Sequence, residues 1–311
     1  MSNRKTATKS NPVSRSRYKA ALSLLDWLKS GQIVYADQKD FGSAMDHSLY
    51  RHIVSNVIRH KLRLEFIASH LTNRSKNKID KEALVSILLG VVQLTEDSKV
   101  EPYAAINESV ELAKALKKPH LKGFINAALR RYSREREMID SLVQQQPLEI
   151  ASSHSQDQVR RWKQFYGDEA TKGICQSNNL FSSVQIVANP SFDLTAIIED
   201  LQGNGYKLES IHDKGFTVRN PSGLFATNWA KKGALLVQDK SFQVLTELVE
   251  HIPKKVILDA CSAPGGKLIH FEWSFSKEIE TLLACEPNIN RLRVLKYNLS
   301  LFKSSAHVIR S

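Results

Sequence analysis

The stretch V-I-L-D-A-C-S-A-P-G-G-K, residues 256–267, decides how the second half of the chain folds. Three apolar residues at 256–258 predict a short buried strand that ends at Asp259. Pro264 and the two glycines after it interrupt regular structure, and a helix can begin at Lys267. Such a strand, turn and helix let a ligand approach bare backbone at the positive end of a helix. The spacing matches neither the dinucleotide pattern G-x-G-x-x-G nor the Walker loop.

A second strand, L-L-A-C-E at residues 282–286, follows the turn and ends in a carboxylate. In open α/β sheets an acid at this place holds the two ribose hydroxyls of a nucleoside ligand, and Glu286 is in that position. The glycine turn followed by an acid therefore predicts a nucleoside-containing cofactor. These two signals alone leave open whether it carries nicotinamide or is S-adenosylmethionine.

The segment D-A-C-S-A-P-G-G-K (259–267) resembles the first motif of the RNA cytosine-5 methyltransferases of the Sun/RsmB (Nol/Nop/Sun) family, commonly D-x-C-A-A-P-G-G-K-T. Ser262 and Leu268 depart from that form. The preceding L-L-V-Q-D-K-S-F-Q (235–243) resembles the family's V-Q-D-x-S-A-Q segment. The resemblance implies S-adenosyl-L-methionine as cofactor. It implies a pocket lined by Cys261, Ser262, Ala263, Pro264, Gly265, Gly266, Lys267 and Glu286.

Composition and charge favour a folded protein with a polyanionic partner. The 311 residues are 42% hydrophobic and carry a net charge of +12. Residues 1–150 hold 25 Lys and Arg against 16 Asp and Glu, a net charge of +9. A basic first half indicates phosphate as a partner, and nucleic acid is favoured over a merely soluble basic surface.

The remaining compositional signals concern the compartment. Three scattered cysteines predict neither a disulfide framework nor a zinc site, so we expect no metal and a reducing, cytoplasmic location. No stretch is apolar enough to span a bilayer, and we expect no membrane partner. The first 17 residues are basic, rich in serine and free of acids, and they lack the apolar core of a secretory signal. A disordered basic arm is preferred here over an organelle transit peptide.

Helical periodicity fills the first half of the chain. Five helices are predicted between Arg15 and about Arg136, the second capped by Asp46, with short connections and no strand pattern. The segments A-A-I-N-E-S-V-E-L-A-K (104–114) and G-F-I-N-A-A-L-R-R (123–131) resemble the NusB fold, an antitermination and RNA-binding domain that Sun/RsmB proteins carry before the methyltransferase. We expect RNA contacts from a basic cluster: Lys117, Lys118, Lys122, Arg130, Arg131, Arg134 and Arg136.

The fold class predicted from these signals is an all-α NusB-like domain, an α+β connecting subdomain and an incomplete α/β Rossmann-like methyltransferase domain. The boundaries expected are a disordered arm at 1–14, the NusB-like domain at 15–142, a linker and connecting helix at 143–174, an RNA-recognition-like α+β subdomain at 175–240, and the first part of the methyltransferase domain at 241–311. In the connecting helix (153–167), Trp162 and Phe165 are expected to pack inward. Phe242 to Val249 is expected to form one amphipathic helix.

The resemblance also predicts what this chain lacks. In the family a cysteine thiolate adds to carbon 6 of cytosine, which activates carbon 5 for methylation. The attacking cysteine lies in a Thr-Cys-Ser motif, and an assisting one lies in Asp-Ala-Pro-Cys. Neither motif occurs here, so we expect them beyond Ser311, and Cys175, Cys261 and Cys285 do not replace them. We therefore expect the 256–258 strand to lack one neighbour. The predicted function is an S-adenosylmethionine-dependent cytosine-5 methyltransferase of small-subunit ribosomal RNA that is catalytically incomplete; the alternative is a non-catalytic NusB-like RNA-binding protein.

Overall fold

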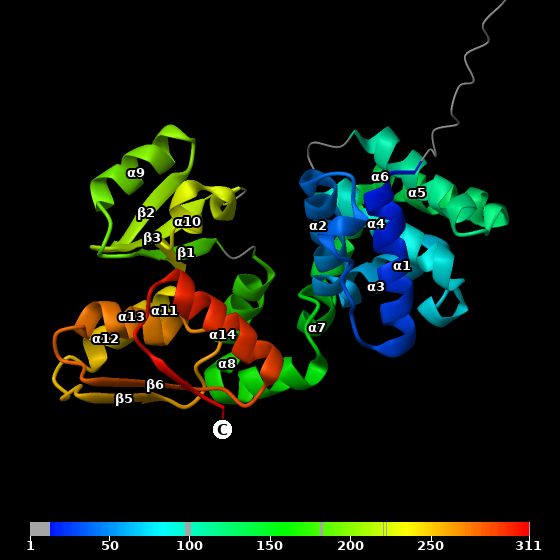
Figure 1. Ribbon diagram of the computed structural model, residues 1–311. Coiled ribbons are helices and arrows are strands. Elements are labelled where there is room, and N and C mark those ends of the chain that lie inside the picture. Colours follow the sequence, from blue (N-terminus) through cyan, green and yellow to red (C-terminus); the bar gives the residue numbers. More distant parts are fainter. Residues whose placement is uncertain (1–12, 97–100, 181–182, 220, 222, 311) are drawn as a thin grey trace, which may run out of the picture. The chain divides into compact units, whose positions relative to one another are not determined.

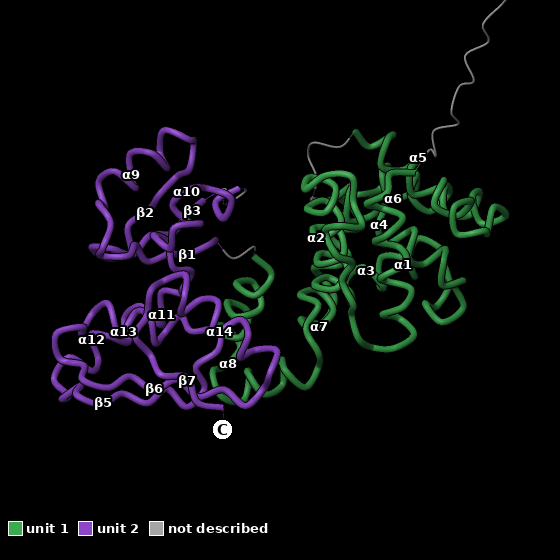
Figure 2. The backbone as a smooth tube through the Cα atoms, in the orientation of Figure 1, with its two compact units in different colours: residues 1–180 green, residues 181–311 purple. Residues whose placement is uncertain are grey.

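The chain divides into two compact units, residues 1–180 and 181–311 (Figure 2). The computed structural model describes residues 13–96, 101–180, 183–219, 221 and 223–310. Within that part, unit 1 is helical and unit 2 contains the strands, three of which form a parallel sheet (Figure 1). The predicted order of an all-α domain followed by α/β structure is therefore confirmed.

Unit 1 contains one more helix in its core region than the sequence analysis predicted. Its helices are α1 (Arg15–Ser30), α2 (Ala44–Arg59), α3 (Lys61–Thr72), α4 (Lys81–Glu96), α5 (Pro102–Ala115), α6 (Lys122–Gln144), α7 (Leu148–Ala151) and α8 (Gln156–Asn179). The missed helix is α3, although Leu64, Ile67 and Leu71 give it a buried face. Only His60 separates α2 from α3, so no turn residue marked the break.

Helix α4 is the centre of unit 1. Every residue from 83 to 93 is buried. Gly90 permits the closest contact, because a Cβ at this position would lie 2.6 Å from the Leu129 side chain of α6. Such an all-round apolar helix belongs inside a bundle, with α1, α2, α3, α5 and α6 packed around it.

The start of unit 1 is fixed more firmly than predicted. Val13 is buried and the Ser14 side chain caps α1 by accepting from the Arg17 amide, so the expected disordered arm does not extend to these two residues. Residues 1–12 lie outside the described part. Helix α2 is likewise capped by Ser43, which accepts from the amide of Asp46, and not by Asp46 itself. A serine or threonine before the first turn is a preferred cap because its hydroxyl satisfies a free amide.

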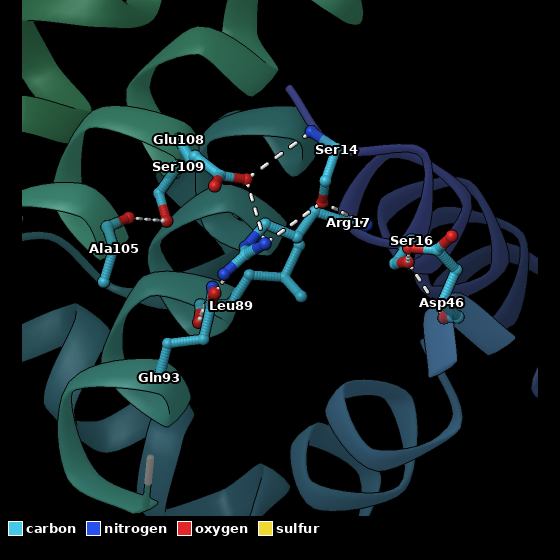
Figure 3. Close-up of polar contacts among 9 residues, drawn as sticks. All are labelled: Ser14, Ser16, Arg17, Asp46, Leu89, Gln93, Ala105, Glu108 and Ser109. Carbon is cyan, nitrogen blue, oxygen red and sulfur yellow. Dashed lines mark hydrogen bonds and ion pairs between the residues drawn. The ribbon is translucent and has the colours of Figure 1, made fainter. Parts of the chain in front are cut away.

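A buried arginine ties α1 to the rest of the bundle (Figure 3). Arg17 is 6% exposed, and its Nε donates to Gln93 Oε1 at 2.5 Å. Its Nη1 donates to Ser14 Oγ at 3.1 Å and pairs with Glu108 Oε2 at 3.0 Å. Glu108 lies within the N-E-S-V-E-L-A-K segment of α5, so this segment has a structural role in the bundle.

The region between the predicted domains differs from expectation in three places. The linker start at 143 falls in α6, whose Val143 is still part of the core. The boundary at 175 falls within α8, which contains Cys175 and runs to Asn179. Helix α8 is broken at Gly167 (φ 78°), where the connecting helix was expected to end. Before this break, Phe165 is 73% exposed, so the prediction that it packs inward is wrong; Trp162 is half-buried against His154.

The first part of unit 2 is an antiparallel sheet with the order β2-β3-β1-β4. Its elements are β1 (Val184–Ala188), α9 (Leu194–Gly203), β2 (Lys207–His212), β3 (Gly215–Arg219), α10 (Asn228–Lys231) and β4 (Leu235–Val237). Phe216 is buried in the core of this sheet, whereas Phe225 is 56% exposed.

The second part of unit 2 is a parallel sheet with the order β5-β6-β7. Its elements are α11 (Lys240–Gln243), α12 (Leu245–Leu248), β5 (Val256–Asp259), α13 (Gly266–Phe275), β6 (Thr281–Cys285), α14 (Ile289–Leu301) and β7 (His307–Ile309). The amphipathic helix expected at 242–249 is two short helices, α11 and α12. Helices α11 to α14 lie on one face of the sheet (Figure 1).

Strand β5 lies at the edge of this sheet and, among the described strands, pairs with β6 only. Val256 is 65% exposed and Leu258 58% exposed, so the prediction that the strand at 256–258 is buried is wrong for these two residues. The two sheets of unit 2 share one core, because Val187 of β1 and Leu236 of β4 pack in the same cluster as Ile269 and Leu295. Within the described residues, no helix is both long enough and apolar enough to cross a membrane.

Candidate functional site

The glycine turn connects β5 to α13 and lies beside the end of β6. Strands β5 and β6 pair in parallel with Asp259 opposite Ala284, so the segments that follow them leave the same edge of the sheet. The Ser262 amide donates to the Cys285 carbonyl at 3.0 Å, which joins the turn directly to the end of β6. The structure therefore brings together the two signals found in the sequence, the turn and Glu286.

Hydrogen bonds within the turn fix its first half. Asp259 Oδ1 accepts from the Cys261 amide at 3.0 Å. Ser262 is 4% exposed, and its hydroxyl donates to the Asp259 carbonyl at 2.7 Å. The sequence motif commonly has alanine here, and the serine satisfies its own hydroxyl locally. Cys261 is exposed and Cys285 is partly buried, whereas Cys175 is buried in α8.

Gly265 is required by the backbone and by packing. Its φ is +108°, a region that side chains disfavour, and a Cβ would lie 3.1 Å from Leu295 Cδ1 of α14. Gly266 faces a looser contact, 3.7 Å to the Val237 carbonyl. The first glycine therefore lets α14 pack against the turn. Lys267 is the second residue of α13, and its Nζ lies 4.6 Å from the centre of the Phe242 ring, a cation–π contact.

Two side chains of α14, Arg291 and Asn298, hold the turn from the opposite side. Arg291 Nη2 donates to the Ala263 carbonyl at 2.7 Å, and Asn298 Nδ2 donates to the Pro264 carbonyl at 2.7 Å. The sequence analysis missed both residues. Their spacing of seven was the available signal, because it places them on one face of the helix.

Glu286 is a buried carboxylate with acceptor capacity left. Its side chain is 2% exposed. Oε1 accepts from the Asn288 amide at 2.9 Å, and Oε2 lies 3.5 Å from Arg291 Nη1. An ionised carboxylate offers about four acceptor positions. The bare turn, an adjacent buried carboxylate and an arginine that contacts both fit a ligand with a ribose.

Two of the predicted RNA-binding arginines of unit 1 contact main-chain carbonyls. Arg131 Nη1 donates to the carbonyls of His70 and Leu71, and Arg136 donates to those of Leu94 and Thr95. These two arginines therefore satisfy the carbonyls at the ends of α3 and α4.

The lysines are partly committed as well. Lys118 Nζ pairs with Asp80 at 3.5 Å, and Lys122 pairs with Glu111. Lys117 has a positive φ of 62° in the connection after α5. Lys118 and Lys122 therefore each have part of their charge offset by a neighbouring carboxylate.

Arg130 and Arg134 line a cavity of about 320 Å³ between α5 and α6. Arg134 is 71% exposed, and Arg130 Nε donates to Asn126 Oδ1 at 3.1 Å. Tyr103, 75% exposed, lines the same cavity. Exposed guanidinium groups beside an exposed aromatic ring form the arrangement that binds single-stranded nucleic acid.

Comparisons with known proteins agree with this architecture. Residues 14–134 match the NusB family. The chain is 27% identical over 281 residues to ribosomal RNA small subunit methyltransferase B of Pseudomonas putida, covering 89% of this chain and 62% of that protein. It is 24% identical over 270 residues to the probable ribosomal RNA small subunit methyltransferase B of Bacillus subtilis, covering 85% of this chain and 58% of that protein. The crystal structure of PH0851 has the same fold, with a TM-score of 0.66 over 99% of this chain and 70% of that one at 15% identity.

The chain therefore combines a helical domain that matches the NusB family with an α/β unit that contains a parallel sheet. Over most of its length, the chain is similar in sequence to proteins named ribosomal RNA small subunit methyltransferase B. It spans 62% and 58% of the length of the two curated relatives named above.

Proposed function

We propose that the chain is the RNA-binding and cofactor-holding part of an S-adenosylmethionine-dependent RNA (cytosine-5) methyltransferase that acts on small-subunit ribosomal RNA. The observation that carries the proposal is the glycine turn joined to Glu286 by the Ser262–Cys285 and Arg291 contacts. The names of the relatives supply the class of RNA.

In this proposal Glu286 accepts hydrogen bonds from the ribose hydroxyls, and residues 261–267 border the methionine part of the cofactor. When bound, S-adenosylmethionine supplies the electrophilic methyl group. Arg291 orients Glu286 and holds the turn through the Ala263 carbonyl. Metal ions have no role in the proposal, and the location proposed for the protein is the cytoplasm.

RNA binding is assigned to unit 1, with Arg130 and Arg134 as the main phosphate contacts and Tyr103 as a surface for a base. The other predicted residues, Arg131, Arg136 and the three lysines, add to the positive field around this cavity. A purely RNA-binding role without a cofactor site is less favoured, because the similarity to the Pseudomonas putida protein covers 89% of the chain and the NusB match only residues 14–134.

The cofactor part of the proposal is tested by photocross-linking labelled S-adenosylmethionine to the full chain. S-adenosylhomocysteine should compete and NAD should not, and Glu286→Ala should reduce the cross-link at least tenfold. The control is Glu280→Ala, a change at an exposed residue just before β6, at the opposite end of that strand from Glu286. Competition by NAD, or an unchanged cross-link in Glu286→Ala, would show that the turn serves another ligand.

Methyl transfer is tested with undermethylated small-subunit ribosomal RNA and methyl-labelled cofactor. We expect no label at carbon 5 of cytosine, because Cys175 is buried in α8 and Cys261 and Cys285 belong to the turn and to β6. If label does appear and is lost in Cys261→Ser, the exposed cysteine of the turn is a nucleophile after all.

A further inference from the structure

A cavity of about 470 Å³ lies in unit 2, at the junction of its two sheets. Its wall combines the turn after β1, the connection after α10, one side of α13 and the end of α14. The residues used below are Phe192, Lys232, Glu272, Trp273, Phe302 and Lys303, which all line it. The volume lies within the range of about 300–1,000 Å³ that is usual for small-molecule sites.

Two lysines give the cavity a positive rim. Lys232 and Lys303 are exposed, and neither forms an ion pair or side-chain hydrogen bond with any residue in the described part of the chain. They come from different elements, one after α10 and the other after α14. Unpaired ammonium groups at the mouth of a cavity attract a phosphate group.

A carboxylate inside the wall has one oxygen committed and one without a partner. Glu272 Oε1 accepts from the amide of Ser305 at 2.7 Å and from its hydroxyl at 2.6 Å. Glu272 Oε2 is buried and has no hydrogen-bond partner within the described residues. Because an unsatisfied buried acceptor is costly, this oxygen favours a ligand that brings a hydrogen-bond donor.

Aromatic side chains complete the cavity. Trp273 and Phe302 contact each other edge to face with their ring centres 5.7 Å apart. Phe192, in the turn after β1, lines the part of the wall that belongs to the antiparallel sheet. All three are only partly buried. Aromatic faces next to cations bind bases of single-stranded RNA through stacking.

We propose that this cavity binds one nucleotide of a single-stranded RNA whose base carries an exocyclic amino group. The lysines contact its phosphate, the aromatic rings contact its base, and Glu272 Oε2 accepts from the amino group. Cytidine, adenosine and guanosine meet this requirement. Uridine does not, because its one ring N–H lies between two carbonyl oxygens that repel a carboxylate. The inference rests on the proposed function for its RNA ligand, and it adds a base-selective contact in unit 2 away from the glycine turn.

The test measures binding of CMP and UMP to the full chain by isothermal titration calorimetry. CMP should bind about tenfold more tightly than UMP, as expected for one specific carboxylate–amino contact. In Glu272→Gln the amide oxygen can still accept from Ser305, but the amide NH2 that replaces Oε2 cannot accept from the amino group of CMP. The preference for CMP over UMP should therefore fall below twofold. The double variant Lys232→Gln and Lys303→Gln should bind CMP at least tenfold more weakly. The matched control is Lys277→Gln with Lys296→Gln, two exposed lysines of unit 2 that do not line the cavity.

A second measurement does not depend on a variant that folds. A tetranucleotide containing 5-iodocytidine is photocross-linked to the unaltered chain, and the cross-linked peptide is identified by mass spectrometry. We expect the peptides that contain Trp273 or Phe302. Cross-links confined to unit 1, or equal binding of CMP and UMP, would overturn the inference and leave the proposed RNA function of unit 1 standing. Selective CMP binding without any binding of ribosomal RNA would overturn the proposed function and leave the nucleotide site.

Discussion

Arg17 of α1 and Glu108 of α5 form an ion pair with 3.0 Å between Nη1 and Oε2, and the arginine side chain is 8% exposed. Two parts of the sequence that are far apart are thereby joined: the start of the first helix and the segment that resembles the NusB motif. The pair is supported by Gln93 and Ser14, so the arginine head group has partners on α4, on α5 and at the N-cap of its own helix (Figure 3).

Removing the acidic partner should destabilise unit 1. In Glu108→Gln the Arg17 charge stays buried with less compensation, and we expect a loss of about 2–4 kcal/mol in the free energy of unfolding. The measurement is urea unfolding followed by circular dichroism. The control is Asp157→Asn, which breaks an equally short ion pair with Arg160 (2.9 Å) at an exposed site and should cost less than about 1 kcal/mol. Equal losses in the two variants would contradict a structural role for the buried pair.

Gly265→Ala should destabilise unit 2. The residue has φ +108°, and the new Cβ would press on Leu295, so we expect a cost of about 2–4 kcal/mol from backbone strain and overpacking. Hydrogen exchange of β6 amides reports the loss, because β6 is the middle strand of this sheet. Gly203→Ala, in α9 with open space around the Cβ, serves as the control and should be neutral or slightly stabilising. Unchanged exchange in Gly265→Ala would mean that the turn tolerates a side chain.

RNA affinity should fall with salt and depend on two arginines of α6. With about five phosphate contacts, the slope of log affinity against log salt should be about −3.5 to −4.5. The double variant Arg130→Gln and Arg134→Gln should reduce the size of that slope by about 1.4, measured by filter binding of single-stranded ribosomal RNA fragments to the full chain. Arg160→Gln with Arg161→Gln, on exposed positions of α8, is the matched control. An identical loss in the control would indicate a diffuse positive field and not a defined site.

Acid should weaken unit 2 through His270. Burial, with the nearby positive charges of His212 and Lys214, lowers the pKa of His270 from 6.5 to about 4. The unfolded state binds a proton at His270 more readily than the folded state does. The contribution of His270 to the free energy of unfolding is therefore fully present above about pH 6.5 and is lost as pH falls toward 4. Between pH 7 and pH 5 we expect a loss of about 2 kcal/mol from this residue.

The measurement is hydrogen exchange of β6 amides at pH 7 and pH 5 after correction for intrinsic exchange rates. His270→Gln removes the titrating group, so its stability should fall less over the same interval, by about 2 kcal/mol. If the variant and the unaltered chain lose equal stability between the two pH values, His270 is not the acid-sensitive group.

Much of the site could be predicted from the sequence because its signals are local. The strand at 256–258, the proline and glycines after it and Glu286 each have a short-range physical meaning, and the structure places them side by side at one edge of a parallel sheet. The resemblance to Sun/RsmB proteins rested on the same residues, and the relatives agree with it. Helices with a clear apolar face and strands bounded by turns were found for the same reason.

The predictions that were wrong or incomplete concern features that have no local signal in the sequence. Helix α3 follows α2 with one residue between them, and no breaker marks the junction. The inward packing of Phe165 was expected for the connecting helix at 153–167, but whether an aromatic side chain is buried depends on which element covers it. The basic cluster read as uniform from the sequence, but Arg131 and Arg136 reach carbonyls at the ends of helices that lie far from them in the chain.

The sequence by itself determined the order of the domains, the turn and the acid that follows it, since these depend on residue types at fixed short spacings. Only the tertiary structure decided which charges are free and which are committed. Arg17 became a buried structural residue, Arg291 and Asn298 became supports of the turn, and Lys232, Lys303 and Glu272 met at one cavity. The physical reason is that a side chain's electrostatic partner is set by distance in space, and in each of these cases the partner comes from a different element of the fold.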